Sequence, residues 1–160
     1  MSETLAFLEQ LRANNRRYLW IDAEVTGTHS FDEASDKPGA SGGRVLRVDA
    51  RLDDSHALAR YNINLGDEAP REIWVAMSPD ALISLRLDGR PLVNEATIPR
   101  RVGNLYADGS LCWMCFGTAT IPRGTHVLEA RADGPALLDV ILFARDPFTP
   151  DGPNQPPSIP

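Results

Sequence analysis

The segment LCWMCFGTATIPRGTHVLEARADGPALLDVILFAR, residues 111–145, decides how the rest of the chain is interpreted. It contains three runs with strand-like composition, and residues 122–124 and 133–135 between them are rich in Gly, Pro and Asp. Such runs, bounded by turn-forming residues, are typical of β-strands packed in a sheet. The segment therefore predicts three consecutive strands joined by two turns.

Similar short runs precede this segment, and tight turns such as Ser78-Pro79-Asp80 separate them. Helical patterns do not alternate with these runs, which argues against a parallel sheet of the dinucleotide-binding kind. Eight or so short strands with Gly, Pro and Asp turns favour an all-β sandwich. The expected strands are residues 18–23, 44–50, 57–65, 72–77, 81–87, 111–121, 125–132 and 137–144, with irregular segments at 25–43 and 91–109.

The two ends of the chain differ in character from the middle. The first residues, MSETLAFLEQLRANNRR, predict a short amphipathic helix with an apolar stripe at Leu5, Leu8 and Leu11. Residues after Asp146 are rich in proline and resemble a linker or an extended tail. A chain of 160 residues fits one domain. We therefore expect a helix at 1–17, a β-sandwich domain at 18–147 and a tail at 148–160.

Composition and charge exclude several classes of partner. The net charge is −6, and the densest basic pairs, Arg16-Arg17 and Arg100-Arg101, are short. A nucleic-acid surface needs a concentrated basic patch, so no nucleic-acid partner is expected. No apolar run approaches the roughly 18 residues that span a membrane, so no membrane partner is expected. The N-terminus does not resemble a signal peptide. The location stays open: extracellular or periplasmic if an export signal has been removed, otherwise cytoplasmic.

Two cysteines, Cys112 and Cys115, have the spacing of a redox or zinc motif. They lie in an expected strand, where residues three apart point to opposite faces. A single pair also supplies only two of the four ligands that zinc usually takes. Buried free thiols are therefore the favoured interpretation.

Taken in order, the motifs of residues 19–150 resemble carbohydrate-binding modules with the galactose-binding-like jelly-roll fold, especially families six and thirty-five. The resemblance implies an all-β sandwich jelly roll, here preceded by the short N-terminal helix. Each motif alone is weak, and their order and spacing carry the likeness. The motifs are Asp22-Ala23-Glu24, ASGGRVL at 40–46, ARYNINL at 59–65, IWVAM at 73–77, ISLRLDGRPL at 83–92, CWMCF at 112–116, IPRGTHVLEARA at 121–132 and LLDVILFARDP at 137–147.

In the modules that the chain resembles, an acidic motif on the first strand and an Asp on the closing strand bind a structural calcium ion. The corresponding residues here are Asp22, Glu24 and Asp139. Two carboxylates two positions apart on a strand point to one face, and calcium prefers oxygen ligands. The departure is Asp22, which is shorter than the usual Glu. The alternative is a solvated or ion-paired cluster, for instance with Arg44.

Sugar binding generally uses aromatic rings together with a few polar groups that fix the hydroxyls. The candidate ligand-binding residues are Trp113, Tyr106, Phe31 and His29. By resemblance, Trp113 lies near the position of a stacking aromatic, although its apolar neighbours are equally compatible with a core position. Related modules often place an Asn before the closing strand, whereas this chain has Gly134-Pro135-Ala136.

The resemblance implies a non-catalytic carbohydrate-binding module that is associated with a glycan-degrading enzyme. Its expected partners are a carbohydrate and a neighbouring catalytic domain. No enzyme is expected, because the hydrolase and phosphate-loop motifs are missing and His29, His56 and His126 lie in separate contexts. The alternative is a structural or protein-interaction β-sandwich without a sugar ligand. Neither interpretation identifies the sugar or its linkage.

Overall fold

The computed structural model describes residues 17–25, 28–31, 33–49, 57–93, 99–154 and 156. The expected N-terminal helix lies outside these residues. In the part of the chain that the structure describes, no helix is long and apolar enough to cross a membrane.

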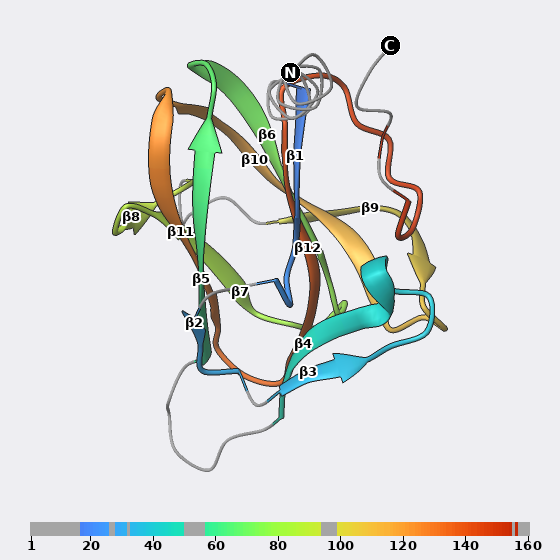
Figure 1. Cartoon of the computed structure of the whole chain (residues 1–160). Helices are drawn as coiled ribbons and strands as arrows, with labels where there is room; N and C mark the ends of the chain where they lie inside the picture. Colours follow the sequence, from blue (N-terminus) through green and yellow to red (C-terminus); the bar gives the residue numbers. More distant parts are fainter. Residues whose placement is uncertain are drawn as a thin grey trace, which may run out of the picture.

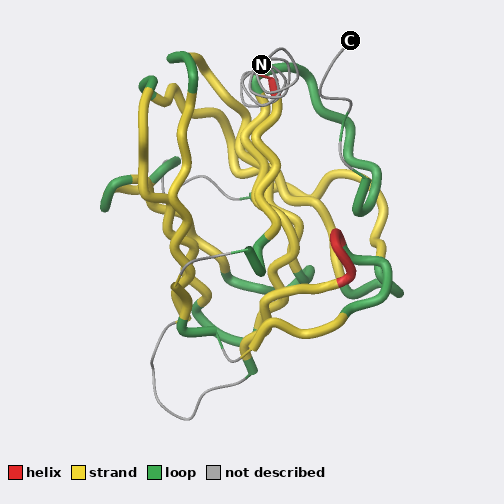
Figure 2. Tube along the Cα trace, viewed as in Figure 1, coloured by secondary structure: helices red, strands yellow, loops and turns green. Residues whose placement is uncertain are grey.

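The described chain is a β-sandwich jelly roll made of two antiparallel sheets (Figures 1 and 2). The larger sheet has the order β3-β4-β12-β6-β10-β9, and β1 also pairs with β12. The smaller sheet has the order β2-β5-β11-β7-β8. The strands are β1 (Tyr18–Asp22), β2 (Thr28–His29), β3 (Glu33–Asp36), β4 (Arg44–Val48), β5 (Ala57–Leu65), β6 (Ala69–Met77), β7 (Ile83–Leu87), β8 (Arg90–Pro91), β9 (Arg100–Tyr106), β10 (Leu111–Ile121), β11 (Gly124–Ala132) and β12 (Ala136–Ala144), with a 3₁₀ turn at Ser41–Gly43.

The main core fills the space between the two sheets, and strand alternation explains it. On β5, every second residue from Ala57 to Leu65 is buried and the residues between them are not. The outer face of the smaller sheet is polar, as the ion pair between Arg60 and Glu129 on β5 and β11 illustrates. This regular pattern is what the sequence of β5 predicts.

The larger sheet is also buried on its outer face. Trp74, Trp113 and Phe148 form a second apolar cluster there, separate from the main core. Phe148 belongs to the chain after β12, which turns back and runs beside β9 (right side of Figure 1). Both faces of β6 and β12 are therefore covered, which explains why β12 is an almost unbroken apolar run.

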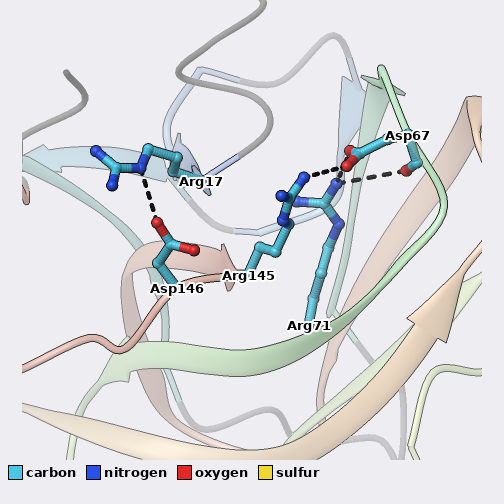
Figure 3. A network of polar contacts seen from close by, with 5 residues as sticks. All are labelled: Arg17, Asp67, Arg71, Arg145 and Asp146. Carbon is cyan, nitrogen blue, oxygen red and sulfur yellow. Dashed lines mark hydrogen bonds and ion pairs between the residues drawn. The ribbon is translucent and has the colours of Figure 1, made fainter. Parts of the chain in front are cut away.

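Arginine–aspartate contacts hold the end of β12 (Figure 3). Arg17 donates to Asp146 at 2.7 Å, and the Arg145 amide donates to the Arg17 carbonyl at 2.8 Å. Asp67 accepts hydrogen bonds from both Arg71 and Arg145. The Arg71 side chain has no exposed surface, so its charge is compensated by Asp67 and not by water.

Two details correct the expectations from sequence. The segments expected to be irregular contain the strands β2, β3 and β9. Phe31, expected at a ligand surface, is 4% exposed and belongs to the main core. The expectation of buried free thiols is confirmed for Cys112, whereas the free thiol Cys115 is half-buried. In the register of β10 with β6, Cys112 lies opposite Met77 of the main core and Cys115 opposite Trp74 of the outer cluster, which places the two cysteines on opposite faces.

Candidate functional site

The strand pairing of β12 creates a junction at Asp139. One edge of β12 pairs with β4 over Ala136–Leu138 and then with β1 over Val140–Ala144. Asp139 lies in the gap between these two ladders, and the register with β6 also shifts there. Such a bulge re-aims a side chain out of the regular alternation. The buried Asp139 carboxylate therefore faces the loop before β4 and the end of β9.

Hydrogen bonds fix the Asp139 carboxylate in that position. The Tyr106 hydroxyl donates to Oδ2 at 2.6 Å, and the Ser41 amide donates to both oxygens at 3.1 and 3.2 Å. The Ala23 amide donates to the Asp139 carbonyl at 2.9 Å. A fully buried carboxylate needs such partners, because an unpaired one would be costly.

Asp22 and Glu24 reach the same junction by different routes. Asp22 is the last residue of β1, and its Oδ1 accepts from the Ser41 hydroxyl at 2.6 Å and from the Trp20 indole at 3.1 Å. Glu24 lies beyond the strand, in a turn closed by the Val25 amide and the Asp22 carbonyl. The argument that both carboxylates share one strand face is therefore wrong, although the turn still brings Glu24 close.

The loop before β4 closes over Glu24 through a glycine. Gly42 has a φ of 65°, and a Cβ at this position would lie 3.2 Å from Glu24 Oε1. A residue with a side chain would be strained there and would press on the carboxylate. Arg44, the alternative partner for the acidic residues, has its Nε 3.6 Å from Asp36 Oδ1, and its charge also acts to lower the pKa of Glu24.

Burial and like charges shape the protonation of this junction. Burial raises the pKa of Asp139 to about 6, against the lowering effect of its hydrogen bonds to Tyr106 and Ser41, and the charges of Asp22 and Glu24 raise it further. Burial also raises the pKa of Glu24. Glu24 Oε2 is buried and has no hydrogen-bond partner among the described residues.

The junction offers carboxylate oxygens, which are the type of ligand that calcium prefers. The raised pKa values of Glu24 and Asp139, the neighbouring Asp22 carboxylate and an unpartnered Glu24 oxygen favour a cation. The arrangement is not ready-made, however. Within residues 17–25, 28–31, 33–49, 57–93, 99–154 and 156, no three acidic, His or Cys side chains are gathered closely enough to hold a metal ion.

A groove runs beside this junction, between the free edges of β1 and β5. Among the described strands, β1 pairs only with β12, and β5 beyond Tyr61 pairs only with β11. The edges of the two sheets therefore stay apart and enclose about 530 Å³. The lining residues are Leu19, Trp20, Ile21, Asp22, Val25, Tyr61, Asn62, Ile63 and Asn64.

The groove combines an aromatic ring with hydrogen-bonding groups. Trp20 is half-buried and tilted against Trp113, with ring centroids 5.5 Å apart. Asn62 and Asn64 are exposed on β5, and each amide offers donors and an acceptor. Asp22 joins the groove to the junction. Such a mixed lining can hold a polar ligand that also has apolar faces.

The four aromatic and histidine candidates lie in three places: Trp113 and Tyr106 in the outer cluster, Phe31 in the main core and His29 on β2. Trp113 is 1% exposed, and its indole donates to the Gly152 carbonyl at 2.9 Å, so it offers no open stacking face. Tyr106 is half-buried with its hydroxyl committed to Asp139. His29 is exposed on β2, opposite Ala59. These residues do not form one surface.

The groove residues were missed from sequence, although a signal existed. In the segment YLWID, Leu19 and Ile21 pack against the main core while Trp20 packs against the outer cluster. Period-two alternation thus places Trp20 and Asp22 together. Nothing in the sequence indicates that the edge of β5 lies across from them, because that proximity is a property of the closed fold.

No protein-family model and no curated protein matches the chain. Solved structures do match. A CBM35 module from Paenibacillus barcinonensis is 12% identical, with a TM-score of 0.58, and the match covers 79% of this chain and 98% of that one. A module of the Cellvibrio mixtus lichenase 5A, solved with cellotriose, is 17% identical, with a TM-score of 0.52 and coverage of 80% and 97%.

A larger enzyme contains the same unit. A GH26-CBM35 β-(1,4)-mannanase from Podospora anserina is 14% identical, with a TM-score of 0.60, and the match covers 84% of this chain. This chain spans only 29% of the mannanase chain. At these identities the likeness establishes that this chain has the fold of the carbohydrate-binding modules.

Proposed function

We propose that the protein is a non-catalytic module that binds a polysaccharide or oligosaccharide. The observation that carries this proposal is the match over 97–98% of the length of whole carbohydrate-binding modules, one of them solved with cellotriose. A chain whose fold matches a carbohydrate-binding module over almost its whole length supports a carbohydrate-binding function for this chain. The mannanase supports association with a glycan-degrading catalytic domain, since its chain joins such a module to an enzyme.

The proposed sugar site is the groove between β1 and β5. A pyranose has apolar faces edged by hydroxyls, which suits the Trp20 ring beside the amides of Asn62 and Asn64. The Asp22 carboxylate can accept from a hydroxyl at the same place. The volume of about 530 Å³ is in the range of small-ligand sites.

Binding to soluble and insoluble glycans tests the proposal, by affinity gels followed by calorimetry with cellotriose. The double variant Asn62→Ala/Asn64→Ala removes exposed amides without opening the core. We expect it to lose roughly tenfold or more in affinity, at about 1 kcal/mol for each hydrogen bond. Thr120→Ala, exposed on β10 of the other sheet, is the matched control. Absence of binding by the wild-type chain to every glycan would favour the protein-interaction alternative, and glycan turnover by the chain alone would contradict a non-catalytic role.

We also propose that calcium binds at the junction. Glu24, Asp22 and Asp139 would hold it, and the ion would neutralise their mutual repulsion. Chelator should then lower the melting temperature and added calcium should restore it, since a ligand of the folded state stabilises it. Magnesium at equal concentration is the control, because calcium accepts the irregular oxygen cage more readily. An unchanged melting temperature would leave the three carboxylates as a metal-free network.

A further inference from the structure

The chain after β12 covers the outer face of the larger sheet. We call residues 146–154 the strap. We call the surface beneath it the aromatic face, which consists of Tyr18, Trp20, Trp74 and Trp113. These side chains belong to one outer apolar cluster with Phe148 of the strap. The strap passes beside β9, where Pro150 lies 3.5 Å from the position of a Cβ on Gly103.

Phe148 is the strap side chain that is buried against the aromatic face. It is 9% exposed, and its ring lies edge-on to three aromatic rings, with centroids 5.1 Å from Trp113, 5.2 Å from Trp74 and 6.4 Å from Tyr18. Edge-to-face pairs at these distances are favourable. One side chain thus makes most of the apolar contact between strap and sheet.

The polar contacts of the strap follow the pattern of proline-rich peptide recognition. The Trp113 indole donates to the Gly152 carbonyl at 2.9 Å, and the Tyr18 hydroxyl donates to the Pro147 carbonyl. Aromatic-lined grooves bind proline-rich segments in this way, since such segments expose carbonyls and have little conformational entropy to lose. Prolines recur at every third position: 147, 150, 153 and 156.

The strap is not part of the sheet. Among the described residues, its one backbone–backbone hydrogen bond is internal, from the Asn154 amide to the Asp151 carbonyl. Its root is fixed by the pair of Arg17 and Asp146 (Figure 3). The strap is held to the aromatic face by the Phe148 side chain and by hydrogen bonds to two of its carbonyls. It can therefore dissociate from this face without breaking hydrogen bonds between strands. Tyr18 also lines a cavity of about 520 Å³ together with residues of the strap, among them Pro147 and Pro150.

The aromatic face keeps one donor unused. Trp74 Nε1 is buried and has no hydrogen-bond partner among the described residues, although Trp74 is only 4% exposed. Buried indole groups usually find an acceptor. The strap in this position therefore does not satisfy the whole face.

We propose that the aromatic face is a docking surface for an extended segment of the type Pro-Phe-x-Pro, and that the strap occupies it as an exchangeable ligand in cis. The partner in trans is the same segment of a second copy of this chain. Exchange of an identical element between copies needs no new interface, because the contacts are the same in both arrangements. The tether favours the cis form, since it gives the strap a millimolar effective concentration.

A labelled peptide with the sequence of residues 146–156 tests the proposal by fluorescence anisotropy against the full chain. The wild-type chain should bind weakly, because its own strap competes. Phe148→Ala in the chain weakens the competitor and leaves the face intact, so we expect the peptide to bind this variant at least roughly tenfold more tightly. Should the alanine variant fail to fold, Phe148→Leu keeps an apolar side chain and carries the same comparison.

Two controls define the contacts. A peptide in which Ala replaces Phe148 should not bind, and Trp113→Phe in the Phe148→Ala chain should weaken binding by removing the indole donor. Equal affinity for both chains, or binding to neither, would overturn the proposal. A variant that gains affinity for cellotriose but not for the peptide would also overturn it.

Discussion

Asp139→Asn should stabilise the protein at neutral pH when calcium is absent. The carboxylate is completely buried, and its pKa lies above that of an exposed Asp. Ionising it in the folded state is therefore unfavourable. Asparagine has nearly the same shape and keeps an oxygen that can accept from the Ser41 amide and the Tyr106 hydroxyl.

The magnitude follows from the pKa shift. The pKa of Asp139 rises from 3.8 to about 6, and each unit corresponds to about 1.4 kcal/mol, so the full effect is about 3 kcal/mol. Because the pKa of Asp139 is raised in the folded state, Asp139 contributes to stability in its protonated form. This contribution is complete below pH 3.8 and is lost as the pH rises through about 6. Replacement by Asn should remove this loss, which amounts to roughly 2 kcal/mol between pH 4 and pH 7.5.

Urea denaturation in chelator at pH 4, 5, 6 and 7.5 measures the effect as the stability difference between variant and wild type. That difference should shift in favour of the variant as the pH rises. Asp108→Asn is the matched control, since Asp108 is exposed and Asn tolerates its φ of 58°. With calcium added, the wild type should gain more stability than Asp139→Asn.

A difference that stays constant from pH 4 to pH 7.5 would refute this account. It would mean that the Tyr106 and Ser41 hydrogen bonds hold Asp139 ionised without cost. A variant that is less stable at every pH would show that the charged acceptor is worth more than its burial costs.

Three further predictions follow from single contacts. Phe148→Ala should lower the free energy of unfolding by about 3–4 kcal/mol, and Phe148→Leu by less, in denaturant titrations. His126 Nδ1 lies 2.7 Å from Asp88 Oδ2. Burial lowers the pKa of His126, but its hydrogen bonds to Asp88 and to the Pro122 carbonyl outweigh burial, so the pKa is raised overall. The stability that this pair contributes is complete below pH 6.5 and is lost above the raised pKa, so the deficit of His126→Gln should be largest at acidic pH and shrink by pH 8.5. Gly42→Ala should destabilise by about 1 kcal/mol or more and also shift the calcium response, because a Cβ there is strained and meets Glu24.

The strand pattern was predictable because alternation reports burial directly. On β5, β10, β11 and β12 the expected bounds agree with the structure to within one residue. The strands β2 and β3 were not predictable, since two and four residues carry no alternation long enough to recognise. The seven-residue strand β9 was also missed. β2 pairs with β5, which is distant in sequence, whereas β3 and β9 pair with the strands that follow them, β4 and β10.

The junction was predictable in membership but not in geometry. Asp139 within an apolar strand indicates a buried carboxylate that needs partners, and Asp22 and Glu24 meet it. The partners themselves, Ser41 and Tyr106, come from a turn and from the end of a strand. Their positions depend on the bulge in β12, which the sequence does not indicate.

The aromatic residues show that burial cannot be predicted from residue type alone. Trp113 has the character of a stacking residue, but the strap covers it, and the strap has the composition of a linker. With the outer face of the larger sheet closed and the inner faces filled by the core, aromatic surface remains accessible mainly along the edge of β1. Trp20 lies there, and the free edge of β5 faces it with two amides. The strap and the groove are thus linked through the contact of Trp20 with Trp113. Opening the strap should therefore alter the packing beneath the groove, and Phe148→Ala should change the affinity of a ligand bound at Asn62 and Asn64 without touching it.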